Sequence, residues 1–271
     1  MHLIPPQYVR PFVKSHKNDF IDAEAIAEAV QRPTMRFVPL KSPEQLDLQA
    51  FHRVRERLVT RRTAIINQIR AFLLERGVVL RQGRAHLARV LPDVLNEPTP
   101  SISERLRLLI EDLRAEWRML DAAISKTTQE IERLATCDSA CQRLTSIPGV
   151  GPVIATALVA AIGNGAAFTK GRDFAAWLGL VPQQHSTGGK PRLLGISKRG
   201  NSYLRRLFVQ GARFLLHADP ARHAFGPWLT ALRTRVHHNV AVIALANKLA
   251  RIAWAVLVRQ EPYRGSAPAT I

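Results

Sequence analysis

The chain of 271 residues carries 39 lysines and arginines against 21 acidic residues, a net charge of +18. Its hydrophobic content of 46% is enough to form a substantial core. A positive charge of this size is typical of proteins that bind a polyanion, above all nucleic acid. The basic residues are spread over the whole chain and are not gathered on one amphipathic helix, which argues against a membrane-surface protein.

The N-terminal residues lack the apolar core of a signal peptide, and the apolar stretch 240–258 is interrupted by Lys248 and Arg251. We therefore expect a cytoplasmic protein without a membrane span. The two cysteines, Cys137 and Cys141, have no partner pair at zinc-finger spacing. They fit two small packing residues in a reducing compartment.

The first elements expected are a strand and a turn in the proline-punctuated residues 2–13, followed by a helix over residues 16–31. The buried face of that helix is expected to hold Ile21, Ala25, Ile26, Ala29 and Val30. Asp19 and Asp22 are three residues apart at its start, so both project from one face. Two such carboxylates could share a Mg²⁺ ion. The alternative is that Asp19 caps the helix and Asp22 interacts with its dipole.

Two long helices are predicted next, over about residues 44–76 and 103–134, with a Gly- and Pro-marked stretch between them. Apolar residues in the second helix alternate in steps of three and four, which is a heptad pattern. The seam consists of Leu106, Ile110, Leu113, Trp117, Leu120, Ile124, Thr127, Ile131 and Leu134. Such a seam needs a partner. The first long helix, as an antiparallel hairpin, and a second copy of the chain are both candidates, and we expect both.

A Pro-Gly-Val-Gly turn at residues 148–151 separates two further predicted helices. Gly149 and Gly151 would expose backbone N–H groups beside a helix N-terminus, where a phosphate can bind. This arrangement resembles the helix-hairpin-helix element of non-specific DNA-binding proteins. An ordinary glycine turn in a helical bundle fits the same residues.

Residues 183–200 combine hydroxyls, glycines and cations, and a basic helix capped by Asn201 follows them. Ser186 and Thr187 precede a Gly-Gly pair, which would let a ligand approach the backbone closely. The cations expected to contact nucleic acid are Lys190, Arg192, Lys198, Arg199, Arg205 and Arg206. A nucleophile, oxyanion donors and positive charge are what phosphoryl transfer uses. A mobile surface loop is the simpler alternative.

Three ordered motifs, KNDFIDAEAIAEA, IPGVGPVIATALVAAIG and GLVPQQHSTGGKPRLLGISKRGNSYLRRL, resemble bacterial transposases of the insertion-sequence 110/1111 family. The resemblance implies a mainly α chain with a RuvC-like (RNase H-like) α/β remnant, a long coiled-coil hairpin and a helical C-terminal domain. The corresponding segments are 1–43, 44–138 and 139–262, followed by a disordered tail over 263–271.

The resemblance also implies the site. Ser186 would be the nucleophile, with Thr187 as the alternative, and Asp19 and Asp22 would be the last two acids of an Asp-Glu-Asp-Asp quartet that binds Mg²⁺. The implied partners are DNA, a structured guide RNA and further copies of the chain in a dimer or tetramer, acting at the bacterial nucleoid.

None of the 18 residues before Asp19 is acidic, so the first two acids of the quartet have no counterpart here. We therefore expect an N-terminally truncated or decayed copy, whose activity is in doubt, or a reading frame with a misplaced start, and not a complete enzyme. A non-catalytic DNA- or RNA-binding protein is the alternative function. A coiled-coil scaffold would explain the heptads and leave the loop residues unexplained.

Overall fold

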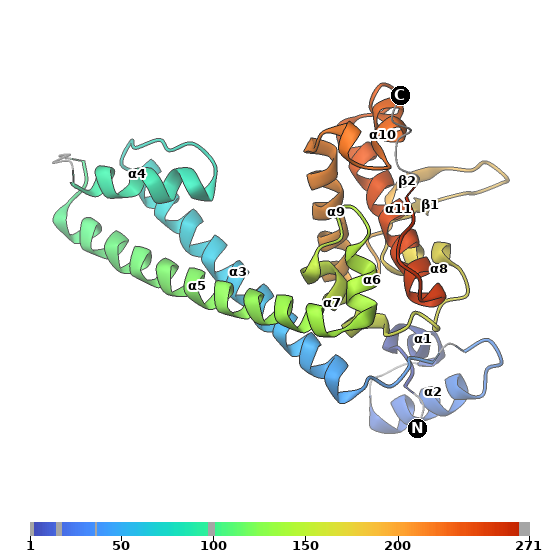
Figure 1. Ribbon diagram of the computed structural model, residues 1–271. Helices are drawn as coiled ribbons and strands as arrows, with labels where there is room; N and C mark the ends of the chain where they lie inside the picture. Colours follow the sequence, from blue (N-terminus) through green and yellow to red (C-terminus); the bar gives the residue numbers. More distant parts are fainter. Residues whose placement is uncertain (1–2, 15–17, 36, 97–100, 266–271) are drawn as a thin grey trace.

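The computed structural model describes residues 3–14, 18–35, 37–96 and 101–265, and these residues are mainly helical (Figure 1). They form eleven α-helices, two short 3₁₀-helices and a single two-stranded sheet. This confirms the prediction of a mainly α chain. The last six residues of the expected tail, 266–271, lie outside the described part of the chain.

Two short helices, α1 (Pro6–Val9) and η1 (Arg10–Phe12), occupy the place of the predicted first strand, and that prediction was wrong. The only β interaction of this segment, among the described residues, is an isolated bridge between Leu3 and Val38. Proline explains the difference, because its fixed φ suits the first turn of a helix and it cannot donate a ladder hydrogen bond.

Helix α2 (Asp19–Val30) begins one residue earlier than a cap at Asp19 would require. The N-cap is Asn18, whose Oδ1 accepts the backbone N–H of Ile21 at 2.8 Å. Asp19 and Asp22 both lie in the first turn. Of the predicted buried face only two alanines, Ala25 and Ala29, are fully buried, while Ile26 and Val30 are exposed. The partners α1 and η1 are too short to cover the larger side chains.

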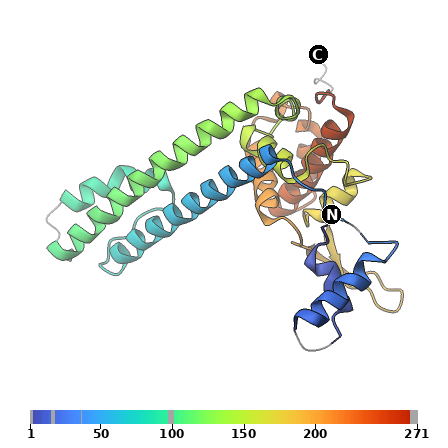
Figure 2. The same cartoon turned by 90° about the horizontal axis from the view of Figure 1, so that it is seen from below.

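Helices α3 (Pro43–Leu74) and α5 (Glu104–Cys137) lie side by side and antiparallel, and Figure 2 shows them extending away from the rest of the chain. Ser42 and Gln45 form a capping box at the start of α3, and Ser103 caps α5. The seam residues buried in the hairpin are Ile110, Trp117, Leu120, Ile124 and Ile131.

A helix that the sequence did not predict, α4 (Arg84–Asn96), covers the far end of the hairpin. Leu87, Leu91 and Leu95 recur every four residues and are buried in one cluster with side chains of α3 and α5. Pro92 lies inside this helix, which normally costs about 3 kcal/mol. Burying three leucines offsets that cost, at about 1.5–3 kcal/mol for each side chain.

The C-terminal unit is a helical bundle around one apolar core. Its helices are α6 (Ser139–Thr145), α7 (Pro152–Ile162), α8 (Gly171–Trp177), α9 (Ser202–His217), η2 (Pro220–Arg222), α10 (Gly226–Arg233) and α11 (His238–Arg259). Helix α11 is long and apolar enough to cross a membrane by composition, but half of that stretch is buried. It packs against α6, α8 and α9, which is the position of a core helix.

The base of the helical hairpin is fastened to α7 and α9 by polar side chains. Lys41 Nζ and Gln45 Nε2 each donate to a carbonyl at the end of α7, at 2.9 Å. His52, only 4% exposed, lies 3.0 Å from both Tyr203 Oη and Thr156 Oγ1. These contacts hold α3 against α7 and α9.

The hydrogen bonds fix the state of the His52 ring. Thr156 Oγ1 donates to the Pro152 carbonyl at 2.7 Å, so it accepts from His52 Nε2–H. His52 Nδ1 then accepts from the Tyr203 hydroxyl, and burial raises the pKa of Tyr203, which keeps that proton in place. Burial and the nearby Arg55 lower the pKa of His52 to about 4.

We predict that His52 makes the protein less stable in mild acid. The unfolded imidazole titrates near 6.5 and the folded one near 4, so between these values only the unfolded state takes up the proton. The contribution of neutral His52 to the free energy of unfolding is about 3 kcal/mol. It is complete above pH 6.5 and is lost as the pH falls toward 4. Urea unfolding of the wild type and His52→Gln across this range measures it. If both lose stability at the same rate, His52 is not the cause.

The turn between α6 and α7 meets α9 at two glycines. A Cβ built on Gly211 would lie 2.3 Å from the Gly149 carbonyl oxygen, and one on Gly149 would lie 2.7 Å from Leu215 Cδ1. Gly149 also has a φ of 82°, a conformation that favours glycine. The two backbones can approach this closely only because neither residue has a side chain.

Gly211→Ala should destabilise the protein by about 2 kcal/mol, because the clash outweighs the gain of about 1 kcal/mol in helix propensity. The matched control is Gln210→Ala, which places the same residue on an exposed position of the same helix. Denaturant midpoints for the two variants check this. Equal midpoints would mean that α9 can move away from the turn without cost.

Candidate active site and nucleic-acid interface

A β-hairpin projects from the C-terminal unit and carries the predicted nucleophile (Figure 1). Its strands, β1 (Pro182–Gln184) and β2 (Leu193–Ile196), pair antiparallel, with Gln184 opposite Leu193. The tip is a two-residue turn at Gly188 and Gly189, whose φ angles of 55° and 73° are both positive. Turns of this kind match the twist of paired strands and strongly favour glycine.

Ser186 is exposed on the strand-like segment just before that tip. Its Oγ accepts Gln184 Nε2–H at 2.8 Å and the Arg192 backbone N–H at 3.3 Å. Both contacts use oxygen lone pairs, so they do not engage the hydroxyl proton. The adjacent Thr187 is also exposed, and its carbonyl oxygen accepts the Lys190 N–H across the turn. Ser186 is therefore the better oriented of the two predicted nucleophiles.

Four of the predicted cations surround the hairpin with exposed side chains: Lys190, Arg192, Lys198 and Arg199. Among the described residues none of the four forms an ion pair with an acid. The hairpin surface is consequently positive and uncompensated, as expected of a surface that binds phosphate groups.

The other two predicted cations already have partners within the protein. Arg205 Nη1 donates to the carbonyl oxygens of Leu178, at 2.9 Å, and Arg199, at 2.8 Å. Arg206 pairs with Glu56 of α3 and lies over the Tyr203 ring. Arg205 thus holds the base of the hairpin and Arg206 joins α9 to α3. Any contact of theirs with nucleic acid would be additional to these structural roles.

The two glycines of the α6–α7 turn differ in accessibility. Gly149 is half-buried against α9, and its carbonyl oxygen faces Gly211. Gly151 is exposed at the N-terminus of α7, and its carbonyl oxygen accepts the N–H groups of Ile154 and Ala155. Only Gly151 is placed where a phosphate could approach it.

The acidic pair lies on a different part of the molecule. Asp19 is exposed and Asp22 is half-buried, in the first turn of α2. Within the described residues no group of three or more His, Cys, Asp or Glu side chains could hold a metal ion. Figure 1 shows α2 below the β-hairpin, and both lie on the side of the molecule away from α4. Among the described residues no side-chain hydrogen bond or ion pair joins Asp19 or Asp22 to the hairpin that carries Ser186.

Charge is distributed very unevenly between the two parts of the chain. Residues 139–271 contain 17 of the 39 basic residues but only three of the 21 acidic ones, a net charge of +14. The remaining 138 residues carry only +4. The electrostatic attraction for a polyanion is therefore concentrated in the unit that carries Ser186.

Sequence patterns did not predict the hairpin or the side chain that orients Ser186. Gln184 lies two residues before Ser186, which is the spacing of side chains on one face of a strand. That alternation was the available signal, but the surrounding glycines and prolines favoured a loop. The polar cluster around His52 was also missed, because its members are distant in the sequence.

Two parts of the chain match families of known proteins. Residues 141–226 match the family model described as Transposase IS116/IS110/IS902 family, and residues 1–76 match a second transposase model, of the DEDD type of IS110. The two matches cover both the acidic pair and the serine hairpin.

Curated relatives are similar over nearly all of the chain. A "Probable family 20 transposase" of Pseudomonas aeruginosa is 46% identical over 97% of this chain and 79% of its own length. The "Transposase for insertion sequence element IS1111A" of Coxiella burnetii is 46% identical over 98% and 73%, respectively. A transposase for element IS1328 of Yersinia enterocolitica is 45% identical over 94% and 75%. The chain accordingly belongs to the IS110/IS116/IS902 family of transposases, enzymes that cut and recombine DNA.

Proposed function

We propose that this transposase uses Ser186 to attack a DNA phosphodiester and then passes the bound strand to a new partner. The observation that carries this proposal is the placement of Ser186. The serine is exposed on a positively charged hairpin, two donors orient its oxygen, and its proton is available for transfer. A buried or paired hydroxyl would not suit such a role.

The chemistry is an exchange of one phosphodiester for another. A bond forms between Ser186 Oγ and phosphorus, and the bond from phosphorus to one of its two sugar oxygens breaks. The serine proton leaves as the bond forms, and the departing oxygen takes up a proton to become a hydroxyl. Because a phosphoserine ester replaces the DNA ester, no other energy source is needed for the reverse attack by a second strand.

Lys190, Arg192, Lys198 and Arg199 would hold the DNA backbone and offset charge on the phosphorus oxygens. Their exposure and lack of acidic partners in the described chain support this role. Contacts of this kind position the backbone without reading sequence. Gly151, at the exposed α7 N-terminus, would add a further backbone contact, whereas the half-buried Gly149 supports the turn.

A Mg²⁺ ion fits Asp19 and Asp22, since Mg²⁺ is often held by one or two carboxylates together with waters and substrate phosphates. When bound, such an ion would polarise a phosphodiester oxygen and so favour attack at phosphorus. In a single chain the acids and the serine lie apart (Figure 1). We propose that the site is completed between subunits, in a homo-oligomer.

A structured guide RNA is the remaining proposed partner, carried over from the family resemblance. The net charge of +14 over residues 139–271 supports binding of a second polyanion beside the DNA. The alternative function, binding of DNA or RNA without chemistry, is favoured by one observation. The described residues contain no group of three or more His, Cys, Asp or Glu side chains that could hold a metal ion. The next two experiments separate these functions.

Ser186→Ala should abolish formation of a covalent protein–DNA adduct on a nicked DNA substrate and leave DNA affinity within about twofold, because only the nucleophilic oxygen is removed. Thr187→Ala is the matched control and should retain the adduct. Denaturing gel electrophoresis with labelled DNA measures both. Adduct formation by Ser186→Ala would remove Ser186 from the mechanism, and loss only in Thr187→Ala would make threonine the nucleophile.

A mixture of Ser186→Ala with the double variant Asp19→Asn, Asp22→Asn should recover part of the adduct that neither variant forms alone. Each would supply the group that the other lacks, if the site is shared between subunits. The recovered signal should depend on the ratio of the two proteins. Mixtures as inactive as the separate variants would indicate a site within one chain, or no catalysis at all.

A further inference from the structure

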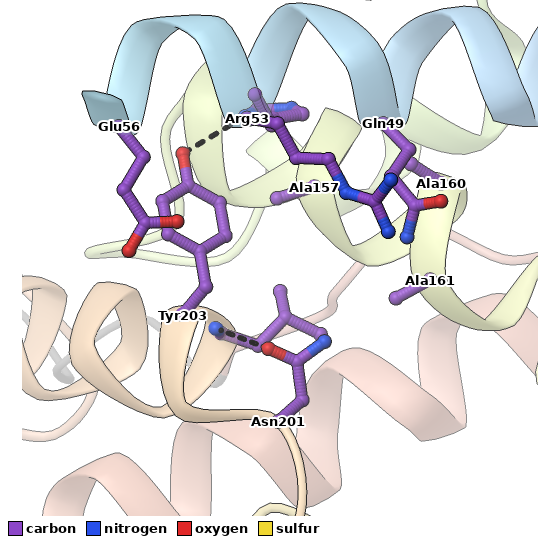
Figure 3. A pocket seen from close by; sticks show the side chains of 10 residues that line it. Gln49, Arg53, Glu56, Ala157, Ala160, Ala161, Asn201 and Tyr203 are labelled. Carbon is purple, nitrogen blue, oxygen red and sulfur yellow. Dashed lines mark hydrogen bonds between the residues drawn. The ribbon is translucent and has the colours of Figure 1, made fainter. Parts of the chain in front are cut away.

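A cavity of about 190 Å³ lies where the base of the helical hairpin meets the C-terminal unit (Figure 3). Its walls come from α3, α7 and the first turn of α9. The floor is formed by three small side chains of α7, Ala157, Ala160 and Ala161. Larger residues there would close the space, so the alanines of α7 keep it open.

The cavity is positively charged. Figure 3 shows the Arg53 guanidinium reaching into the space between α3 and Asn201, and no described acid pairs with it. Lys41 is near enough that burial and, secondarily, the charge of Arg53 lower the pKa of its amine. The acid in the wall, Glu56, is already paired with Arg206. Two cations therefore approach each other here without a free carboxylate between them.

Uncharged donors also face the same space. The Oδ1 of Asn201 accepts the Leu204 N–H at 3.0 Å, and its amide nitrogen points toward the cavity in Figure 3. The N-terminus of α9, a helix of 16 residues, adds the positive end of its dipole. Gln49 contributes a second side-chain amide from α3. Several N–H donors around a cation match a tetrahedral anion with several oxygens, as a phosphate has.

We propose that this cavity is a phosphate subsite that holds one backbone phosphodiester of the bound nucleic acid, DNA or RNA. The inference rests on the proposed function, since it assumes that the chain binds such a polymer. Because Arg53 comes from α3 and Asn201 from the start of α9, a phosphate held by both would connect the hairpin with the C-terminal unit. Binding would then stiffen the junction that sets the direction of the hairpin.

The test compares Arg53→Gln with Arg57→Gln in the full chain. Arg57 lies one turn further along α3, is exposed and lines no part of the cavity, so it controls for the loss of one charge. Fluorescence anisotropy with a labelled DNA duplex and, separately, a labelled RNA hairpin gives the affinity over a range of salt concentrations. We expect Arg53→Gln to weaken binding about tenfold and to reduce the salt slope by about one, and Arg57→Gln to change neither by as much.

A second variant removes the space and leaves the charge. Ala161→Leu directs a larger side chain from the half-buried position 161 into the cavity. It should weaken binding of the same nucleic acid whose binding Arg53→Gln weakens. The polymer whose binding both variants weaken, the DNA duplex or the RNA hairpin, is the one that supplies the phosphate. The subsite is disproved if the wild type binds but Arg53→Gln equals Arg57→Gln, or if Ala161→Leu binds as the wild type does. A wild type that binds neither polymer would instead overturn the proposed function.

Discussion

The packing of the first turns of α3 against α7 and α9 fixes the position of the helical hairpin relative to the rest of the molecule. Helix α3 has 32 residues, a length of about 48 Å, so a tilt of about 10° at its base would move its far end by roughly 8 Å. His52 lies at this base, and each of its ring nitrogens is hydrogen-bonded, one to Tyr203 of α9 and the other to Thr156 of α7. A buried polar group with both partners in place resists such a tilt, because breaking either hydrogen bond leaves an unpaired group away from water.

The β-hairpin places Ser186, the proposed nucleophile, away from the core of the helical bundle. Two strands alone are marginally stable in water, so this hairpin depends on its base. Arg205 donates to two carbonyls there, and the N–H of Lys198 donates to the Gly179 carbonyl at 3.2 Å. Gly200 allows the chain to pass within contact of the Trp177 carbonyl, since a Cβ would lie 1.8 Å from that oxygen. The tip is left exposed with its cations.

Charge and the candidate site residues are divided between separate parts of the molecule. The C-terminal unit carries most of the net charge and the serine, and the acidic pair lies on the small N-terminal helical segment below it in Figure 1. The apolar core of the helical hairpin is separate from that of the C-terminal unit, so the polar contacts at their junction determine how the two are oriented.

The sequence alone determined the features that depend on neighbours along the chain. Capping residues and the spacing of apolar side chains predicted α2, α3, α5 and α9 within a few residues, and the order of motifs indicated the transposase family. Local patterns also placed Ser186 among glycines and cations. What they could not decide was which partner each polar group would meet.

Only the tertiary structure decided those partnerships. Glu56 and Arg206 are 150 residues apart in sequence, and His52 and Tyr203 are 151 apart, yet each pair is in contact. The same long-range packing made a helix of residues 84–96 in spite of Pro92, and turned a glycine-rich loop into a paired hairpin. Periodicity reports which face of a segment is apolar, whereas the position of a charge or hydroxyl depends on surfaces that the folded chain brings together.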